Sequence, residues 1–335
     1  MVVAMSEKPD RNLGLELVRA TEAAALAAAR WVGLGQKESG DRAAVDAMRV
    51  LLRTVRMDGT IVIGEGEKDN APMLFNGESV GNGSGPQVDV AVDPVEGTNL
   101  LAKGVHNSLA VLAVSERGTM YQPGPAFYMD KLVVGPTASG TVDLDASVAE
   151  NLHAIAVAKG MRMEEITVVI LDRARNAQKI AAVREAGARV RLITDGDVAP
   201  ALMTALPGTG VNALMGIGGT PEGVVTACAM RGFGGEIQAR LAPQSDAERK
   251  RVMKAGLDLD GKFSTEKMVG GHDHYFAATG ITEGDFLRGV HYTRDGAVTT
   301  SVVTRSRSGT WRMIESHHRW KKLRQISDIP YYNRN

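Results

Sequence analysis

Acidic side chains follow strand-like segments of this 335-residue chain, at positions where they could hold metal ions. The run TIVIGEGE ends in Glu65 and Glu67, and VDVAVD ends in Asp93, with Glu96 shortly after it. Taken one at a time, each carboxylate is explained equally well as a strand terminator or a helix cap. Gathered in one desolvated cleft, they would repel one another strongly unless cations neutralised them. Carboxylate ligands without a His or Cys cluster favour Mg²⁺ or Mn²⁺ over Zn²⁺.

The run Asp93-Pro-Val-Glu-Gly-Thr98 is the strongest single motif. It supplies two carboxylates, a hydroxyl and a glycine that allows close approach of the backbone. Metal ions held there would polarise a phosphoryl oxygen and lower the pKa of a bound water, and Thr98 could orient that water for in-line attack. Backbone amides around Gly97 could bind the phosphate itself. The motif therefore predicts metal-dependent phosphate chemistry.

Polar residues also follow the strands that we predict in the second half of the chain. ITVVILD leads into Arg173 and Arg175, RVRLIT leads into Asp195 and Asp197, and NALMGIGG leads into Glu222 at a predicted helix start. Ligands of open α/β sheets bind beyond the carboxyl ends of the strands, so we expect these side chains to line one site. The remaining histidines of interest lie outside these motifs and are interpreted as ordinary loop residues: His106, His272 and His274.

Two helices should precede the first strand. Residues 13–32 are rich in alanine with apolar side chains at helical spacing, and residues 41–57 place an apolar stripe on one face. Asp41 begins the second stripe, where it is either an N-terminal capping charge or an inward-facing ligand. The polar segment 244–262 is interpreted as a surface helix whose charges face solvent.

The length of the chain favours two closely packed domains of overall α/β class. Residues 1–160 combine helices and strands, which predicts an α+β domain that holds the metals. Residues 161–335 begin with alternating strands and helices, which predicts a doubly wound α/β domain for the substrate. The last strand-like runs, with a hairpin turn at residues 294–296, could return to the neighbouring sheet.

Composition limits the partners and the compartment. Lys plus Arg and Asp plus Glu both total 39, so the charge balance indicates neither nucleic acid nor an anionic membrane as a partner. The single cysteine, Cys228, excludes an internal disulfide and fits a reducing compartment. The N-terminus turns charged before it forms the apolar core of a signal peptide, and no apolar stretch could span a bilayer. We expect a cytoplasmic protein with a small-molecule partner.

With these residues in place, the chain resembles the class II fructose-1,6-bisphosphatases of the lithium-sensitive, metal-dependent phosphatase superfamily. The landmarks follow the family's order over almost the full length: RATEAAALAAARWVG, GQKESGD, DGTIVIGEGEKDNAPML, VDPVEGTN, FYMDKL, LITDGDV and GIGGTPEGV. Singly the glycine-rich pieces are weak, whereas the ordered set is very specific. The resemblance implies a layered α-β-α-β-α fold and a homo-oligomer, either a dimer or a tetramer.

The resemblance also implies the roles of individual residues. The metals would be surrounded by Asp41, Glu65, Asp93, Glu96 and Glu222, with the backbone carbonyl of Val95 as an extra ligand. The catalytic group would be Thr98, Asp41 and Glu65, with Thr98 and Asp41 positioning the attacking water. The substrate would contact Glu96, Gly97 and Thr98 at the 1-phosphate, and Tyr128, Arg173, Arg175, Asp195 and Asp197 at the sugar and distal phosphate. Lys37 is either a further substrate contact or a solvated loop lysine.

The expected reaction is hydrolysis of the 1-phosphate of D-fructose 1,6-bisphosphate without a covalent phosphoenzyme. The run VEGTNL resembles members that also accept sedoheptulose 1,7-bisphosphate, and one sugar carbon is worth only a modest free energy, so a bifunctional enzyme is the first alternative. The others are an inositol-monophosphate-type or nucleotide phosphatase and a catalytically silent sugar-phosphate sensor. Four residues depart from the family pattern around Asp41 and the distal phosphate: Gln36, Arg42, Arg173 and Asn176.

Overall fold

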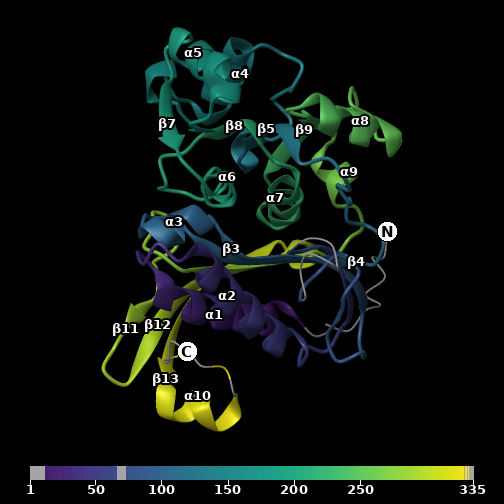
Figure 1. Cartoon of the computed structure of the whole chain (residues 1–335). Coiled ribbons are helices and arrows are strands. Elements are labelled where there is room, and N and C mark those ends of the chain that lie inside the picture. The colour runs from purple at the N-terminus through teal and green to yellow at the C-terminus, as the bar shows by residue number, and fades with distance from the viewer. Residues whose placement is uncertain (1–11, 66–72, 328, 330, 332–335) are drawn as a thin grey trace, which may run out of the picture.

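The computed structural model describes residues 12–65, 73–327, 329 and 331 of the chain. Glu67 and residues 1–11, which entered the sequence predictions, lie outside this range. Helices and two β-sheets alternate in α-β-α-β-α layers, as the resemblance implied (Figure 1). The helices of these layers are α1 (Gly14–Ala28), α2 (Lys37–Leu52), α4 (Val148–Lys159), α5 (Ala177–Glu185), α6 (Val198–Met203) and α7 (Thr220–Phe233).

The larger sheet has eight strands in the order β11-β12-β10-β4-β3-β1-β2, with β13 paired to β12. Only β1 and β3 run parallel, and every other neighbouring pair is antiparallel. Its strands are β1 (Asp58–Ile63), β2 (Ser79–Val80), β3 (Gln87–Glu96), β4 (Leu109–Glu116), β10 (Tyr275–Gly280), β11 (His291–Tyr292), β12 (Gly296–Arg305) and β13 (Thr310–Arg319). The C-terminal strands therefore return to the sheet that the N-terminal half begins.

The smaller sheet has five strands in the order β7-β6-β8-β5-β9. Strand β6 runs parallel to β7 and β8, as expected of a doubly wound unit, whereas β5 is antiparallel to both of its neighbours. The strands are β5 (Tyr128–Val134), β6 (Thr167–Leu171), β7 (Arg189–Ile193), β8 (Ala213–Gly219) and β9 (Glu236–Leu241). This sheet is mixed rather than parallel, because β5 arrives from the N-terminal half of the chain.

Apolar clusters bind the layers together, and three of them pack the helices against the sheets. Helices α1 and α2 cover one face of the larger sheet, where short side chains such as Ala24 and Ala44 let the helices pack closely. Helices α6 and α7 fill the space between the two sheets, and α4 and α5 cover the outer face of the smaller sheet (Figure 1). Burial on both faces explains why strands such as β4 are apolar throughout rather than alternating.

Shorter elements connect the layers. The remaining helices are α3 (Thr98–Lys103), α8 (Asp246–Lys254), α9 (Thr265–Met268) and α10 (Trp320–Ile326), and the 3-10 helices are η1 (Ala29–Trp31), η2 (Pro136–Ala138), η3 (Met163–Glu165), η4 (Ala174–Asn176) and η5 (Ser306–Ser308). No helix in the described ranges has both the length and the apolar character needed to cross a membrane.

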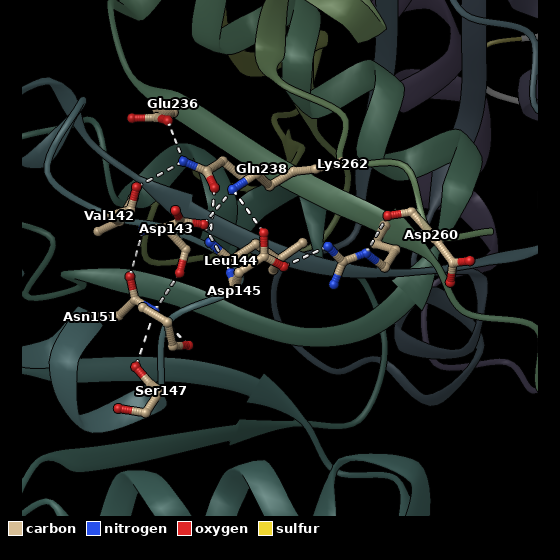
Figure 2. A network of polar contacts seen from close by, with 12 residues as sticks. Val142, Asp143, Leu144, Asp145, Ser147, Asn151, Glu236, Gln238, Asp260 and Lys262 are labelled. Carbon is tan, nitrogen blue, oxygen red and sulfur yellow. Dashed lines mark hydrogen bonds and ion pairs between the residues drawn. The ribbon is translucent and has the colours of Figure 1, made fainter. Parts of the chain in front are cut away.

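A polar network fastens the loop before α4 to the edge of the smaller sheet (Figure 2). Gln238 on β9 donates to the carbonyl of Val142 at 2.8 Å, and its side-chain oxygen accepts from the backbone of Leu144 at 2.8 Å. Lys262 forms ion pairs with Asp143 and Asp145. Asp143 and Asp145 thus have cationic partners from the chain.

Candidate active site

A cavity of about 1040 Å³ opens between the two sheets, at the carboxyl ends of strands β1, β3, β6, β7 and β8. Every side chain that the sequence proposed for the site lies on its lining: Lys37, Asp41, Glu65, Asp93, Glu96, Gly97, Thr98, Tyr128, Arg173, Arg175, Asp195, Asp197 and Glu222. None of His106, His272 and His274 lines it. Residues far apart in the sequence thus meet at one place, as the strand-end rule predicts.

Asp41 faces this cavity from within α2. The helix begins at Lys37 with Gln36 as its N-cap residue, and no side chain caps its first turn by a hydrogen bond. Asp41 therefore sits too deep in the helix to cap it, and it lines the cavity instead. Burial raises the pKa of Asp41, while the nearby ammonium of Lys37 acts in the opposite direction. Burial raises the pKa of Glu65 to about 7, and the neighbouring charge of Asp41 adds to that shift.

Asp93 and Glu96 reach the cavity from one strand because the pairing of β3 with β4 is irregular between them. In a regular strand, residues three apart face opposite sides of the sheet. Here Pro94, which has no N–H, interrupts the regular ladder. Burial raises the pKa of both carboxyls well above their ordinary values. The neighbouring charge of Glu65 raises the pKa of Asp93 further, and the charge of Asp93 does the same to Glu96. Gly97 follows at φ 77°, a left-handed conformation that starts α3 directly after Glu96.

The acidic wall formed by Asp41, Glu65, Asp93, Glu96 and Glu222 has no ion pair with a cationic side chain among the described residues, and two of its buried oxygens have no hydrogen-bond donor there. Glu96 is only 2% exposed. Its Oε2 has no hydrogen-bond partner among the described residues, and neither have the buried oxygens Asp197 Oδ1 and Glu222 Oε2. Buried acceptor oxygens without donors are costly. Hard divalent cations with oxygen ligands would satisfy them, so the donor set fits Mg²⁺ or Mn²⁺. Within the part of the chain that the structure describes, no three His, Cys, Asp or Glu side chains converge tightly enough to enclose one ion.

Two hydrogen bonds tie the acidic wall to the loop after β7. The backbone N–H of Val198 donates to Glu96 Oε1 at 3.3 Å, and the backbone N–H of Asn99 donates to Asp195 Oδ2 at 3.1 Å. The hydroxyl of Thr98 lies beside these contacts and makes no hydrogen bond with any described residue. Thr98 can therefore donate to and accept from a ligand or water.

The part of the cavity lining that follows strand β6 is cationic. The guanidinium of Arg175 lies 4.6 Å from the centroid of the Tyr128 ring, and its Nε donates to the carbonyl of Ile217 at 3.0 Å. Arg173 donates to the carbonyls of Asp172 and Thr194. Neither arginine has a carboxylate partner among the described residues. Both charges are thus held in place by neutral oxygens and remain available to an anion.

Asn176, one of the departures from the family pattern, positions this part of the lining rather than belonging to it. Its Oδ1 accepts from the backbone N–H of Ile217 at 2.7 Å, and its Nδ2 donates to the carbonyl of Leu171 at 3.0 Å. The side chain is buried and ties η4 to strand β8. The neutral amide of Asn176 therefore holds the backbone next to Arg175 in place.

Segment 244–262 contains the predicted surface helix as α8, and most of its charged side chains are exposed, but the interpretation was wrong for Glu248. Glu248 is buried and accepts hydrogen bonds from the backbone N–H groups of Phe127 and Tyr128, at 2.9 and 3.2 Å. One turn later, the guanidinium of Arg251 lies 5.6 Å from the Phe127 ring centroid and lines the cavity. The alternation of acidic and basic residues in DAERKR concealed these contacts, because Glu248 and Arg251 look like their solvated neighbours in sequence.

Lys131 is a further residue that the sequence predictions missed, after Glu248 and Arg251. It lies on β5, where it is 1% exposed, and its Nζ is 2.5 Å from Asp197 Oδ2. Its neighbour Asp130 in the strand YMDKLVV is also charged, so the local sequence did not indicate that Lys131 is buried, although buried lysines are rare unless paired.

Comparison with known proteins gives concordant results. A family model described as bacterial fructose-1,6-bisphosphatase, glpX-encoded, matches residues 11–318. The chain is 44% identical over 334 residues to a D-fructose 1,6-bisphosphatase class 2/sedoheptulose 1,7-bisphosphatase from Synechococcus sp. (strain JA-3-3Ab), covering 92% of this chain and 96% of that protein. It is also 44% identical over 321 residues to fructose-1,6-bisphosphatase 1 class 2 from Escherichia coli (strain K12), covering 92% and 95%.

Proposed function

The chain belongs to the family of bacterial, glpX-encoded fructose-1,6-bisphosphatases, and from that membership we propose that it hydrolyses the 1-phosphate of D-fructose 1,6-bisphosphate, releasing fructose 6-phosphate and inorganic phosphate. The observation that carries the proposal is that one cavity is lined both by the acidic wall and by the guanidinium groups of Arg173 and Arg175, which have no carboxylate partner among the described residues. A substrate with a phosphate at each end matches both, since cations can accompany one phosphate and arginines can bind the other.

In this proposal the metals are Mg²⁺ or Mn²⁺, held by Asp41, Glu65, Asp93, Glu96 and Glu222. Such ions, when bound, polarise a phosphoryl oxygen and lower the pKa of a water molecule. The donor set supports this assignment, because Glu96 Oε2 and Glu222 Oε2 are buried and have no donor in the described chain.

The protein's own part in the reaction is to position the water and the phosphate. The hydroxyl of Thr98, which has no partner in the described chain, would orient the attacking water, with Asp41 and Glu65 as acceptors on the same wall. The water oxygen bonds to phosphorus while the ester bond between phosphorus and the sugar oxygen breaks, and that oxygen takes up a proton. The backbone of Gly97, in its left-handed conformation at the start of α3, can approach the phosphate closely.

The sugar and its distal phosphate would lie on the smaller sheet. We assign the distal phosphate to Arg173 and Arg175, with Tyr128 beneath the second guanidinium and Lys37 at the rim. The hydroxyls would bond to Asp195 and Asp197, which carry acceptor oxygens on the loop after β7. Arg251 on α8 is a further cation for the distal phosphate, because its guanidinium faces the cavity without a hydrogen bond or ion pair to any described residue.

Sedoheptulose 1,7-bisphosphate is a second candidate substrate. Two relatives from Synechococcus, at 44% and 43% identity, carry both sugar bisphosphates in their names. In this chain two neighbouring aromatic residues, Phe127 and Tyr128, each lie beneath a different guanidinium. Two cations at different places could receive the distal phosphate of a shorter and a longer sugar, which supports dual specificity.

The deciding experiment measures phosphate release from fructose 1,6-bisphosphate, sedoheptulose 1,7-bisphosphate and inositol 1-phosphate, each with Mg²⁺, Mn²⁺ or EDTA. We expect metal-dependent release that favours fructose 1,6-bisphosphate, and comparable heptulose turnover would establish the bifunctional enzyme. Preference for inositol 1-phosphate would move the chain to the monophosphatase class. A folded protein that binds fructose 6-phosphate but turns over no substrate with any metal would instead be a sugar-phosphate sensor.

A further inference from the structure

Among the described residues, one lysine is buried between the two sheets, behind the wall of the cavity. Lys131 projects from β5, and its Nζ donates to Asp197 Oδ2 at 2.5 Å and to the carbonyl of Gly219 at 3.1 Å. Both side chains of the pair are almost fully buried, at 2% and 5% exposure. A buried ion pair is a poor source of stability compared with well-packed apolar groups, so its presence calls for another reason.

The turn from β8 into α7 is shaped around this lysine. A side chain on Gly218 would collide with both Lys131 and Asp197, and one on Gly223 would collide with Met129 beside the lysine stem. Gly219 lies between them and has no room for a side chain because of Glu222. Three positions of the run GIGGTPEG thus have room only for glycine, because the side chains of Lys131, Asp197 and their neighbours Met129 and Glu222 occupy the adjacent space.

The partners of Lys131 lead in two directions toward the acidic wall. Asp197 is the N-cap residue of α6, and the next N–H, that of Val198, donates to Glu96 Oε1 at 3.3 Å. Gly219 is the N-cap residue of α7, which presents Glu222 in its first turn. The ammonium group of Lys131 therefore contacts both helix starts. The start of α6 donates a hydrogen bond to Glu96, and the start of α7 carries the side chain of Glu222.

The pair also leaves Asp197 available for a ligand. Lys131 occupies Oδ2, while Oδ1 is buried without any hydrogen-bond partner in the described chain. An ammonium ion on one oxygen fixes the orientation of the carboxylate, so the second oxygen has a defined direction.

We propose that Lys131 is a positioning residue, which holds Asp197 for the sugar and, through α6 and α7, holds Glu96 and Glu222 for the metals. The proposal rests on the proposed function, since it extends the roles assigned there to a residue behind them. Residues behind metal ligands typically change metal affinity about 10–100-fold when they are substituted, although they touch no metal.

The test compares Lys131→Met with Lys179→Met, measuring Mn²⁺ affinity by calorimetry in the absence of substrate. Lys179 is a matched control because it pairs with Asp130, the neighbour of Lys131 on β5, at a half-buried site away from the cavity. We expect Lys131→Met to weaken Mn²⁺ binding at least about tenfold and Lys179→Met to leave it unchanged. Fructose 6-phosphate affinity should fall in parallel in Lys131→Met alone. Wild-type affinity for both ligands in folded Lys131→Met would overturn the proposal.

A second variant covers the case in which Lys131→Met fails to fold with Asp197 left unpaired. Lys131→Met/Asp197→Asn removes both charges, so it should regain thermal stability while its Mn²⁺ affinity stays at least about tenfold weaker than that of the wild type. Recovery of Mn²⁺ affinity would show that Lys131 only neutralises Asp197 and would overturn positioning. These binding measurements need no turnover. If the wild type released no phosphate, the proposed function would fail while the role of Lys131 was still decided.

Discussion

At the scale of single residues, the cavity combines groups that are unfavourable in isolation. Glu96, Asp197 and Glu222 each bury an oxygen without a donor. Burial and mutual repulsion raise the pKa of the carboxyls around them. Arrangements of this kind reduce stability and persist at functional sites, where a ligand supplies the missing interactions. The polar network at the edge of the smaller sheet has the opposite character, since Lys262 and Arg240 pair with its carboxylates.

Thr98→Ala tests the assigned role of the hydroxyl. We expect kcat on fructose 1,6-bisphosphate to fall about 10²–10⁴-fold, the range found for groups that position a transferred proton, while KM changes little. Steady-state kinetics would measure both constants. Thr119→Ala is a suitable control, because the Thr119 hydroxyl only donates to the carbonyl of Glu116 and does not line the cavity. Unchanged kcat in Thr98→Ala would remove Thr98 from the catalytic group.

Cys228 supplies a prediction that is independent of the active site. The thiol is buried in α7 and donates to the carbonyl of Tyr275 at 3.3 Å, and burial raises its pKa to about 12 from an ordinary 9.0. In the unfolded chain the thiol ionises at lower pH, so between about pH 9 and 12 the folded state binds more protons and stability falls as pH rises.

Thiol reagents can follow this directly. Because the thiolate is the reactive form, native protein should not react with a disulfide reagent at pH 8, and one thiol per chain should react in denaturant. In Cys228→Ala, the free energy of unfolding should fall less between pH 8 and 10.5 than it does in the wild type, because the thiol no longer contributes. Urea unfolding at the two pH values would measure this difference. Rapid modification of the native protein would contradict the burial of this residue.

At the scale of elements, local sequence patterns predicted where the helices and strands lie better than they predicted which strands pair with one another. The alanine-rich segment forms α1 and the apolar stripe forms α2. The run that ends in Asp93 forms most of β3, and the run RVRLIT before Asp195 forms β7. Strand β5 was predicted as an element of the N-terminal half, but it pairs with β8 and β9. Pairing between distant strands depends on tertiary packing, which hydrophobic periodicity within a segment does not record.

The same limit applies to the site. Strand-end positions identified the carboxylates and arginines of the cavity, because the geometry of sheets brings strand ends together. Lys131 and Glu248 act through contacts to other elements, and a lysine or glutamate in such a contact has no local signature. Strand β9 and the position of α8 over Phe127 were likewise outside what the sequence patterns predicted.

Helix α8 allows a test of the cationic part of the cavity. We expect Arg251→Gln to raise KM for fructose 1,6-bisphosphate about tenfold with little change in kcat, because a hydrogen bond to a charged group contributes about 1.5–3 kcal/mol. The effect should be larger for sedoheptulose 1,7-bisphosphate, whose distal phosphate reaches further. Arg249→Gln is the matched control, since Arg249 lies on the same helix and is exposed outside the cavity. Equal kinetics of the two variants would exclude Arg251 from the substrate site.

At the scale of the whole molecule, the acidic wall lies where the two sheets meet. Asp93 and Glu96 belong to the larger sheet, whereas Glu222 follows a strand of the smaller one. Like charges on both sides of the cavity therefore oppose the packing of the layers until cations neutralise them. Metal binding should consequently stabilise the fold as well as support the reaction.

This coupling predicts the effect of metal on unfolding. A ligand that binds only the native state stabilises it by about 2.7 kcal/mol at a concentration 100-fold above its Kd, so Mn²⁺ should raise Tm by several degrees over EDTA. Asp93→Asn removes one charge from the repelling group, and we expect its metal-free Tm to exceed that of the wild type while its Mn²⁺ shift largely disappears. Scanning calorimetry with EDTA and with Mn²⁺ would measure both.

The control for this experiment is Asp295→Asn, in the exposed turn between β11 and β12. It removes the same charge from a place remote from the cavity, so both its metal-free Tm and its Mn²⁺ shift should equal those of the wild type. A metal-free Asp93→Asn protein less stable than the wild type would mean that Asp93 is already satisfied by the chain, through contacts such as the hydrogen bond from the backbone N–H of Val95 at 3.1 Å. The higher stability expected instead would show that this carboxylate is retained for the ligand it binds, at the expense of the fold.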